Sequence, residues 1–111
     1  MRIRRLHAEG TTTPGLGEPF HPKTSLVSLV AQVGGESGSA VSATMSVLGE
    51  VNGFDPSPIE FGGSSIISLS GTTSAQWEGQ IAGNGYETIH LQLLSLSTLA
   101  SFKAAATEAE A

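Results

Sequence analysis

The sequence contains no cysteine, few charged residues and no long apolar run. Without cysteine, the chain forms neither a disulfide framework nor a Cys-based zinc site. Charged residues make up 14% of the 111 residues and aromatic residues 5%, which indicates a surface rich in small uncharged side chains. No apolar run approaches the roughly 20 residues of a membrane helix. The basic start, MRIRRLHAEG, lacks the apolar core of a secretory signal. We therefore expect a single-domain intracellular product with no membrane partner.

A recognisable catalytic or cofactor-binding motif is also missing. The three histidines, His7, His21 and His90, have no acidic or nucleophilic neighbour at the spacing of a catalytic dyad or triad. His7 and Glu9 share a strand face if extended, which a solvated face explains better than a metal site. The Gly pairs at 34–35 and 62–63 lack the Lys and the following helix of a phosphate loop. The sequence predicts no enzymatic activity, no metal and no cofactor.

Charge is unevenly divided along the chain. The first 25 residues hold four Arg and Lys against two Glu, a net charge of +2, while the remainder holds one Lys against eight Asp and Glu, a net charge of −7. Arg2, Arg4 and Arg5 suit contact with nucleic acid or with an acidic protein surface. Three charges on a short segment are weak support for DNA binding, and the overall charge of −5 disfavours nucleic acid as a direct partner.

Apolar residues that alternate with polar ones predict an all-β protein. The densest example is 83–97 (GNGYETIHLQLLSLS), where a Gly-Asn-Gly turn signal precedes a strand with one buried face. Similar strands are predicted at 25–33, 41–51 and 74–82, with Gly-rich turns between them. This pattern is typical of an antiparallel β-sandwich, here of about 7–8 short strands. A helix competes only over 97–109, where Ala and Glu are frequent. The predicted core comprises Val27, Leu29, Val47, Trp77, Ile89, Leu91 and Leu93.

The composition divides the chain into three parts. Residues 1–24 are predicted to form an extended N-terminal arm, a short strand followed by a Pro/Gly-rich strap. The strap, 10–22, holds three Pro and three Gly, so it forms neither a helix nor a central strand, and Leu16 and Phe20 are its apolar anchors. Residues 25–106 are predicted to form the β-sandwich domain, and 107–111 an acidic tail.

Four segments together resemble a known family. They are the arm leading into SLVSLVAQV, the strand and loop ATMSVLGEVNGF, the corner ISLSGT, and the strand GNGYETIHLQLLSLS, which cover about residues 20–100. In these segments the chain resembles the β-sandwich head decoration (cement) proteins of tailed bacteriophages. The resemblance implies a non-enzymatic virion protein that binds the major capsid protein, stabilises the shell and forms trimers or dimers. It also implies a location on the capsid surface after assembly in the host cytoplasm.

Under this interpretation the arm is a strap across a neighbouring subunit, and the polar but uncharged face of 83–97 lies against another protein. That face carries Thr88, His90 and Gln92. The predicted partner contacts are Arg2, Arg4, Arg5, Leu16, Phe20 and His90. Two alternatives stay open: a tail or head–tail connector subunit, and a glycan-binding module that uses Trp77 or Tyr86 as an exposed platform.

Overall fold

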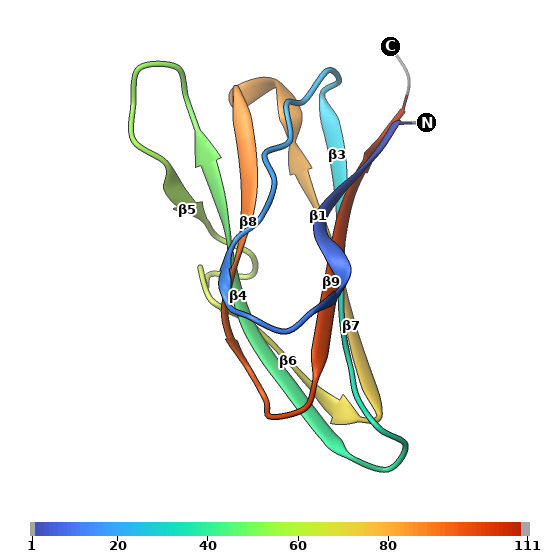
Figure 1. Ribbon diagram of the computed structural model, residues 1–111. Helices are drawn as coiled ribbons and strands as arrows, with labels where there is room; N and C mark the ends of the chain where they lie inside the picture. Colours follow the sequence, from blue (N-terminus) through green and yellow to red (C-terminus); the bar gives the residue numbers. More distant parts are fainter. Residues whose placement is uncertain (1, 110–111) are drawn as a thin grey trace.

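A computed structural model describes residues 2–109 and forms two antiparallel sheets that face each other (Figure 1). Sheet A has the strand order β1-β9-β3-β7, and sheet B has the order β2-β8-β4-β5, with β6 also paired to β4. The predicted all-β antiparallel sandwich is confirmed. Its strands are β1 Arg2–Thr11, β2 Gly15–Leu16, β3 Leu26–Gly34, β4 Ala40–Glu50, β5 Ser57–Ile59, β6 Ile67–Thr72, β7 Ser74–Ala82, β8 Thr88–Leu96 and β9 Ser101–Glu108. A 3-10 turn, Gly83–Gly85, precedes β8.

Residues 101–108 form a strand, so the helical alternative for 97–109 is wrong. Strand β9 lies between β1 and β3 and pairs with both. Its Ala residues alternate between the core, where Ala104 and Ala106 are buried, and the outer face, where Ala105 lies. No helix within residues 2–109 has the length and apolar character needed to cross a membrane.

The core lies between the two sheets and is built from the inward-facing positions of each strand. Six residues of the predicted core are at most 2% exposed: Val27, Leu29, Val47, Ile89, Leu91 and Leu93. Trp77 differs, because it is only half-buried. Strand β7 is an edge strand, so its inner face opens at the rim of the sandwich. There the Trp77 ring packs edge-on against Phe61, with ring centroids 5.0 Å apart.

The N-terminal segment is an integral strand, so the boundary predicted between an arm (1–24) and a sandwich (25–106) is wrong. Strand β1 pairs with β9 along its length, and a register shift between Arg5 and His7 marks a β-bulge at Leu6. The bulge turns the side chains of Leu6 and His7 both inward, where they are 1% and 7% exposed. The His7 ring donates its Nε2–H to the Leu91 carbonyl at 2.8 Å.

The Pro/Gly-rich strap crosses from sheet A to sheet B and closes the gap between β1 and β8 (Figure 1). Glu18 N–H donates to the Leu6 carbonyl at 2.8 Å, and Phe20 exchanges two 2.8 Å backbone hydrogen bonds with Ile89. Gly17 is required here, because a Cβ at this position would clash with the Leu6 carbonyl. The strap therefore lies on its own sandwich, and the predicted contact of the strap with a neighbouring subunit stays a prediction.

The predicted acidic tail begins inside β9, because that strand continues to Glu108. The Glu108 side chain is fully buried and pairs with the Arg2 guanidinium. Its carboxylate also accepts hydrogen bonds from the backbone N–H groups of Lys23 and Thr24, each at 3.0 Å, and from Thr24 Oγ1 at 2.9 Å. One carboxylate thus ties together both ends of the chain and the strap. Of the predicted tail, residues 110 and 111 lie outside the described residues.

Candidate interaction surface

The outer face of sheet B carries a set of hydroxyl side chains. Along β4, the core residues Val41, Ala43 and Met45 alternate with outward-facing Ser42 and Thr44. The register places Ser70 and Ser68 of β6 beside these two positions, and Ser95 of β8 on the other side of Thr44. We call this surface the hydroxyl face. It comprises Ser42, Thr44, Ser68, Ser70, Thr72, Ser95 and Ser97, while Ser46, the next outward position on β4, is only 4% exposed.

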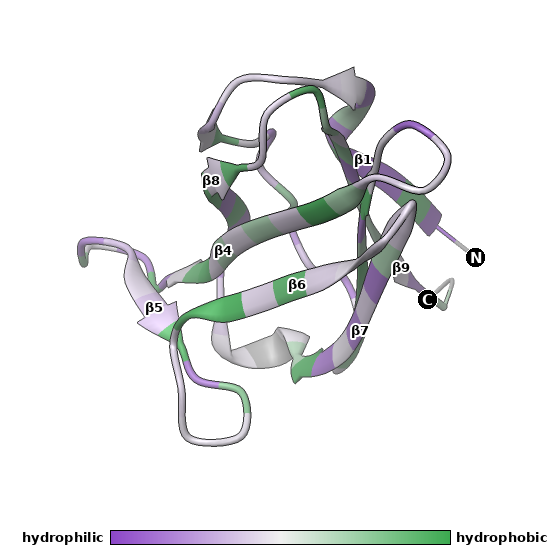
Figure 2. Ribbon diagram, turned by 90° about the horizontal axis from the view of Figure 1, so that it is seen from below, coloured by the Kyte–Doolittle hydropathy of each residue, from purple (hydrophilic) through white to green (hydrophobic). Residues whose placement is uncertain are grey.

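Local hydrogen bonds fix part of this face and leave part of it open. Thr44 Oγ1 and Ser95 Oγ are 2.5 Å apart, and the Ser42 N–H donates to Ser97 Oγ at 3.0 Å. Ser68 and Ser70 on β6 are exposed. Figure 2 shows β4 and β6 side by side without the strongly hydrophilic bands that mark β1 and β7. The open side of the hydroxyl face is therefore the β6 side.

This composition lowers the cost of covering the face with another protein. Burying a charge requires an exact partner, whereas a hydroxyl both donates and accepts and so adapts to several partners. Ser and Thr also lose little rotamer freedom on burial compared with Lys, Glu or Arg. The hydroxyl face therefore suits contact with a protein surface, and it lacks the aromatic rings that sugars stack on.

The residues of 83–97 that are predicted to lie against another protein, Thr88, His90 and Gln92, are on sheet B next to the hydroxyl face. Gln92 pairs in register with Ser46, and His90 with Leu48. His90 is half-buried, with its Nδ1 3.5 Å from the Gly17 carbonyl. Thr88 is only 7% exposed, and its hydroxyl lies 3.2 Å from His21 Nδ1. Gln92 and His90 thus extend the hydroxyl face, whereas Thr88 is already covered.

Two of the predicted partner contacts are internal instead. Phe20 is 0% exposed and belongs to the core, because its backbone pairs with Ile89 and draws the ring between the sheets. Arg2 extends across this ring, with its guanidinium carbon 5.5 Å from the ring centroid, and pairs with Glu108. Both residues therefore hold the strap against the sandwich. Phe20 has no surface left for a partner, whereas 38% of the Arg2 side chain stays exposed.

The other predicted contacts are dispersed. Arg4 donates to the Pro19 carbonyl at 3.1 Å, while Leu16 is 57% exposed on β2. Arg5 is exposed on the outer face of sheet A, since it pairs in register with Ala105. His90 lies on sheet B, on the opposite side of the molecule. Leu16 lies next to His90 on sheet B, because it pairs in register with Gln92 of β8, but Arg5 is far from both.

The two rings that the glycan-binding alternative requires, those of Trp77 and Tyr86, are only partly exposed. Trp77 is half-buried against Phe61, and Tyr86 is half-buried against the core beside Gly49.

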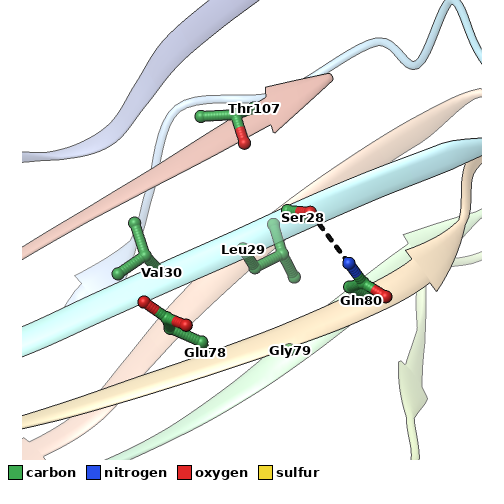
Figure 3. Close-up of a pocket in the computed structure, with 7 residues that line it drawn as sticks. All are labelled: Ser28, Leu29, Val30, Glu78, Gly79, Gln80 and Thr107. Atoms are coloured by element: carbon green, nitrogen blue, oxygen red, sulfur yellow. Dashed lines mark hydrogen bonds between the residues drawn. The ribbon is translucent and has the colours of Figure 1, made fainter. Parts of the chain in front are cut away.

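The outer face of sheet A is hollowed rather than flat. One hollow of about 400 Å³ lies between β3 and β7. Figure 3 shows the side chains that line it, with Glu78 and Gln80 beside Val30 and Ser28. Gln80 Nε2 donates to Ser28 Oγ at 3.5 Å. Glu78 is the single ionisable group lining this hollow, so it offers neither a nucleophile–base pair nor a metal-ligand set. Across residues 2–109, no group of three or more His, Asp and Glu side chains gathers in a way that would hold a metal.

Three structural features escaped the sequence interpretation: the hydroxyl face, the Glu108 carboxylate and Phe54. Phe54 is 72% exposed in the loop between β4 and β5. Its signal was available, because it stands between turn-forming residues in NGFDP with no alternating apolar partner. The burial of Glu108 had no local signal, since its partners lie some 85 to 106 positions away.

The fold defines a two-sheet antiparallel β-sandwich with a strap-closed edge. It is similar to the crystal structure of the SPBc2 prophage-derived protein YomS, with a TM-score of 0.56 and 14% sequence identity. The similarity covers 96% of this chain and 92% of YomS. At this identity the similarity establishes the fold. No protein-family model and no curated protein sequence matches the chain.

Proposed function

We propose that this chain is a structural protein of a tailed-phage virion, a decoration protein that binds the major capsid protein shell and stabilises it. It acts by binding, without catalysis or a cofactor, and resides on the capsid surface after assembly in the host cytoplasm. The observation that carries the proposal is the hydroxyl face, an uncharged surface on the outside of sheet B. The resemblance in sequence to decoration proteins and the shared fold with a prophage-derived protein support the phage context.

The size of the molecule suits a decoration protein. A standard protein–protein interface buries about 800 Å² on each partner, a small part of the 6079 Å² surface of this chain. The outer face of sheet B thus serves as the contact while sheet A stays exposed. Each subunit needs only a moderate affinity, because many copies together stabilise a shell.

The proposal predicts how the affinity for the shell depends on salt concentration. Because the hydroxyl face carries no charge, its contact with the shell gains little from ion pairs. Affinity for the shell should therefore change little between low salt and about 0.5 M salt. Attachment through Arg4 or Arg5 would instead weaken steeply with salt.

The test is co-sedimentation of the full chain with purified phage shells that lack it. Ser70→Arg puts a long charged side chain on the open side of the hydroxyl face, and we expect shell binding to weaken at least tenfold. Gln80→Arg is the matched control, since it adds the same charge at an exposed position on the outer face of sheet A. Equal binding by both variants would overturn the assigned surface. Failure of the unaltered chain to bind shells, with recovery in tails or connectors, would overturn the decoration role.

A further inference from the structure

The basic side chains of this molecule are confined to one part of it, whereas the acidic side chains are spread over all of it. All five Lys and Arg residues lie on β1, on β9 or in the loop before β3. With the three acids of the same part of the chain, they give it a net charge of +2. The remaining acids of residues 2–109 number six, with no Lys or Arg among them. The molecule is therefore electrostatically polar, although its total charge is small.

The negative part includes an exposed aromatic side chain. We call residues 50–60 the acidic hairpin, the end of β4 with β5 and the loop between them, which contains Glu50, Asp55 and Glu60. Phe54 is 72% exposed in this loop and Val51 is 47% exposed. The hairpin projects from the body on the side away from β1 and β9 (Figure 1). An exposed aromatic ring on a projecting loop is the kind of anchor that carries binding energy at interfaces.

The positive part includes a hollow of matching character. We call it the basic notch: a depression of about 250 Å³ on the outer face of sheet A, with Arg5 and Lys103 among the residues that line it. Val30 and Ala105 contribute small apolar surface to it. No acidic side chain lines it, but Glu78 borders it, since Glu78 pairs in register with Val30 and its carboxylate accepts a hydrogen bond from Gln76, which lines the notch. Two cations around apolar surface suit an aromatic ring followed by a carboxylate.

We propose that the acidic hairpin of one copy docks in the basic notch of a second copy of this chain. Phe54 lies on Val30 and Ala105 with its ring against the Arg5 guanidinium, a cation–π contact. Asp55 follows and pairs with Lys103. Charge complementarity selects a second copy as the occupant, because the charged residues of the hairpin are all acidic and the two charged residues that line the notch are both basic.

The contact joins two different surfaces, so it is heterologous. Hairpin and notch lie on opposite sides of the sandwich, so one copy cannot satisfy its own notch (Figure 1). Repetition of a heterologous contact produces a ring or an open chain, depending on the rotation between copies. Neither surface includes the hydroxyl face, so the inference stands independently of the proposed binding to a shell.

Charge reversal gives a decisive test by sedimentation velocity at low salt. Asp55→Lys and Lys103→Glu each place like charges at the contact, and we expect each variant alone to associate at least tenfold more weakly than the unaltered chain. An equimolar mixture restores association, because the reversed hairpin of one variant meets the reversed notch of the other, and the unaltered hairpin meets the unaltered notch at the next junction. Ser70→Lys on the hydroxyl face is the control and should associate normally. Thermal unfolding monitored by circular dichroism verifies that each variant is folded.

A zero-length carboxyl–amine cross-linker tests the same contact in the unaltered chain. With a mixture of ¹⁴N- and ¹⁵N-labelled protein, we expect mixed-isotope peptides that join Asp55 to Lys103. The proposal is overturned if the unaltered chain is monomeric in every condition in which it is soluble. It is also overturned if the mixture of reversed variants stays dissociated, or if the cross-links join other residues and leave Asp55 unreacted.

Discussion

At the scale of single residues, Glu108 is the side chain on which most of the long-range order depends. Its buried carboxylate pairs with Arg2 and accepts hydrogen bonds from Lys23 and Thr24. Charged hydrogen bonds are stronger than neutral ones, and their loss leaves buried donors unsatisfied. A residue close to the C-terminus therefore determines how β1 and the strap are held.

Replacing this carboxylate by an amide tests its role. We expect Glu108→Gln to lower the free energy of unfolding by about 1.5–3 kcal/mol. The charge is lost, and the new amide NH₂ group, a hydrogen-bond donor, faces groups that are themselves donors. Urea denaturation monitored by Trp77 fluorescence measures the change. Glu18→Gln is the control: its carboxylate is exposed, 3.9 Å from Arg4, so its loss should cost less than about 1 kcal/mol. An equal loss of unfolding free energy in both variants would mean that the buried Glu108 carboxylate contributes no more than a surface ion pair.

The sequence conceals this residue for a physical reason. In TEAEA, Glu108 is one of two acids among small residues, a composition that predicts a solvated tail. Its burial depends on Arg2, more than a hundred positions earlier, and on backbone N–H groups that any residue supplies. The local sequence pattern indicates secondary-structure propensity and which side of a strand faces the core. It does not indicate a buried charge whose partners lie far away in the chain.

At the scale of elements, the alternation of apolar and polar residues predicts the strands, whereas the sequence of the strap does not predict where the strap lies. The prediction of a strand over 74–82 matches β7 residue for residue, and the strand in 83–97 was found because Ile89, Leu91 and Leu93 alternate with polar residues. The strap has no such period. Its Pro and Gly residues exclude a helix, but they do not indicate which surface the strap packs on. In the structure the strap packs on its own sandwich, because Phe20 pairs with Ile89 of β8.

Two strap residues separate the internal role from an external one. Phe20→Ala empties a fully buried site and should cost about 3–5 kcal/mol of unfolding free energy. Leu16→Ala, four positions earlier and 57% exposed, should change stability by less than about 0.5 kcal/mol. Chemical denaturation of both variants measures the difference. A stable Phe20→Ala variant would contradict the anchoring of the strap and favour an arm that reaches a neighbour.

At the scale of the whole molecule, the sandwich separates an uncharged surface from a charged one. Ser42 and Thr44 alternate with apolar residues in the sequence, so their common facing was predictable. The sequence does not predict that they form one surface with Ser68, Ser70 and Ser95, because that depends on β4 lying between β6 and β8. The same holds for the basic notch, since β1 brings Arg5 next to β9 only through pairing of the two ends of the chain. Surfaces assembled from distant strands follow from topology, which the local pattern leaves open.

The central claim is that this chain decorates a phage shell through the outer face of sheet B. The most direct measurement is a cryo-electron microscopy map of the virion at a resolution that separates the two sheets. We predict density for this sandwich on the outside of the shell, with Ser68 and Ser70 against the major capsid protein and sheet A facing away from it. Density confined to the tail or the connector, or a shell contacted by sheet A, would contradict the claim.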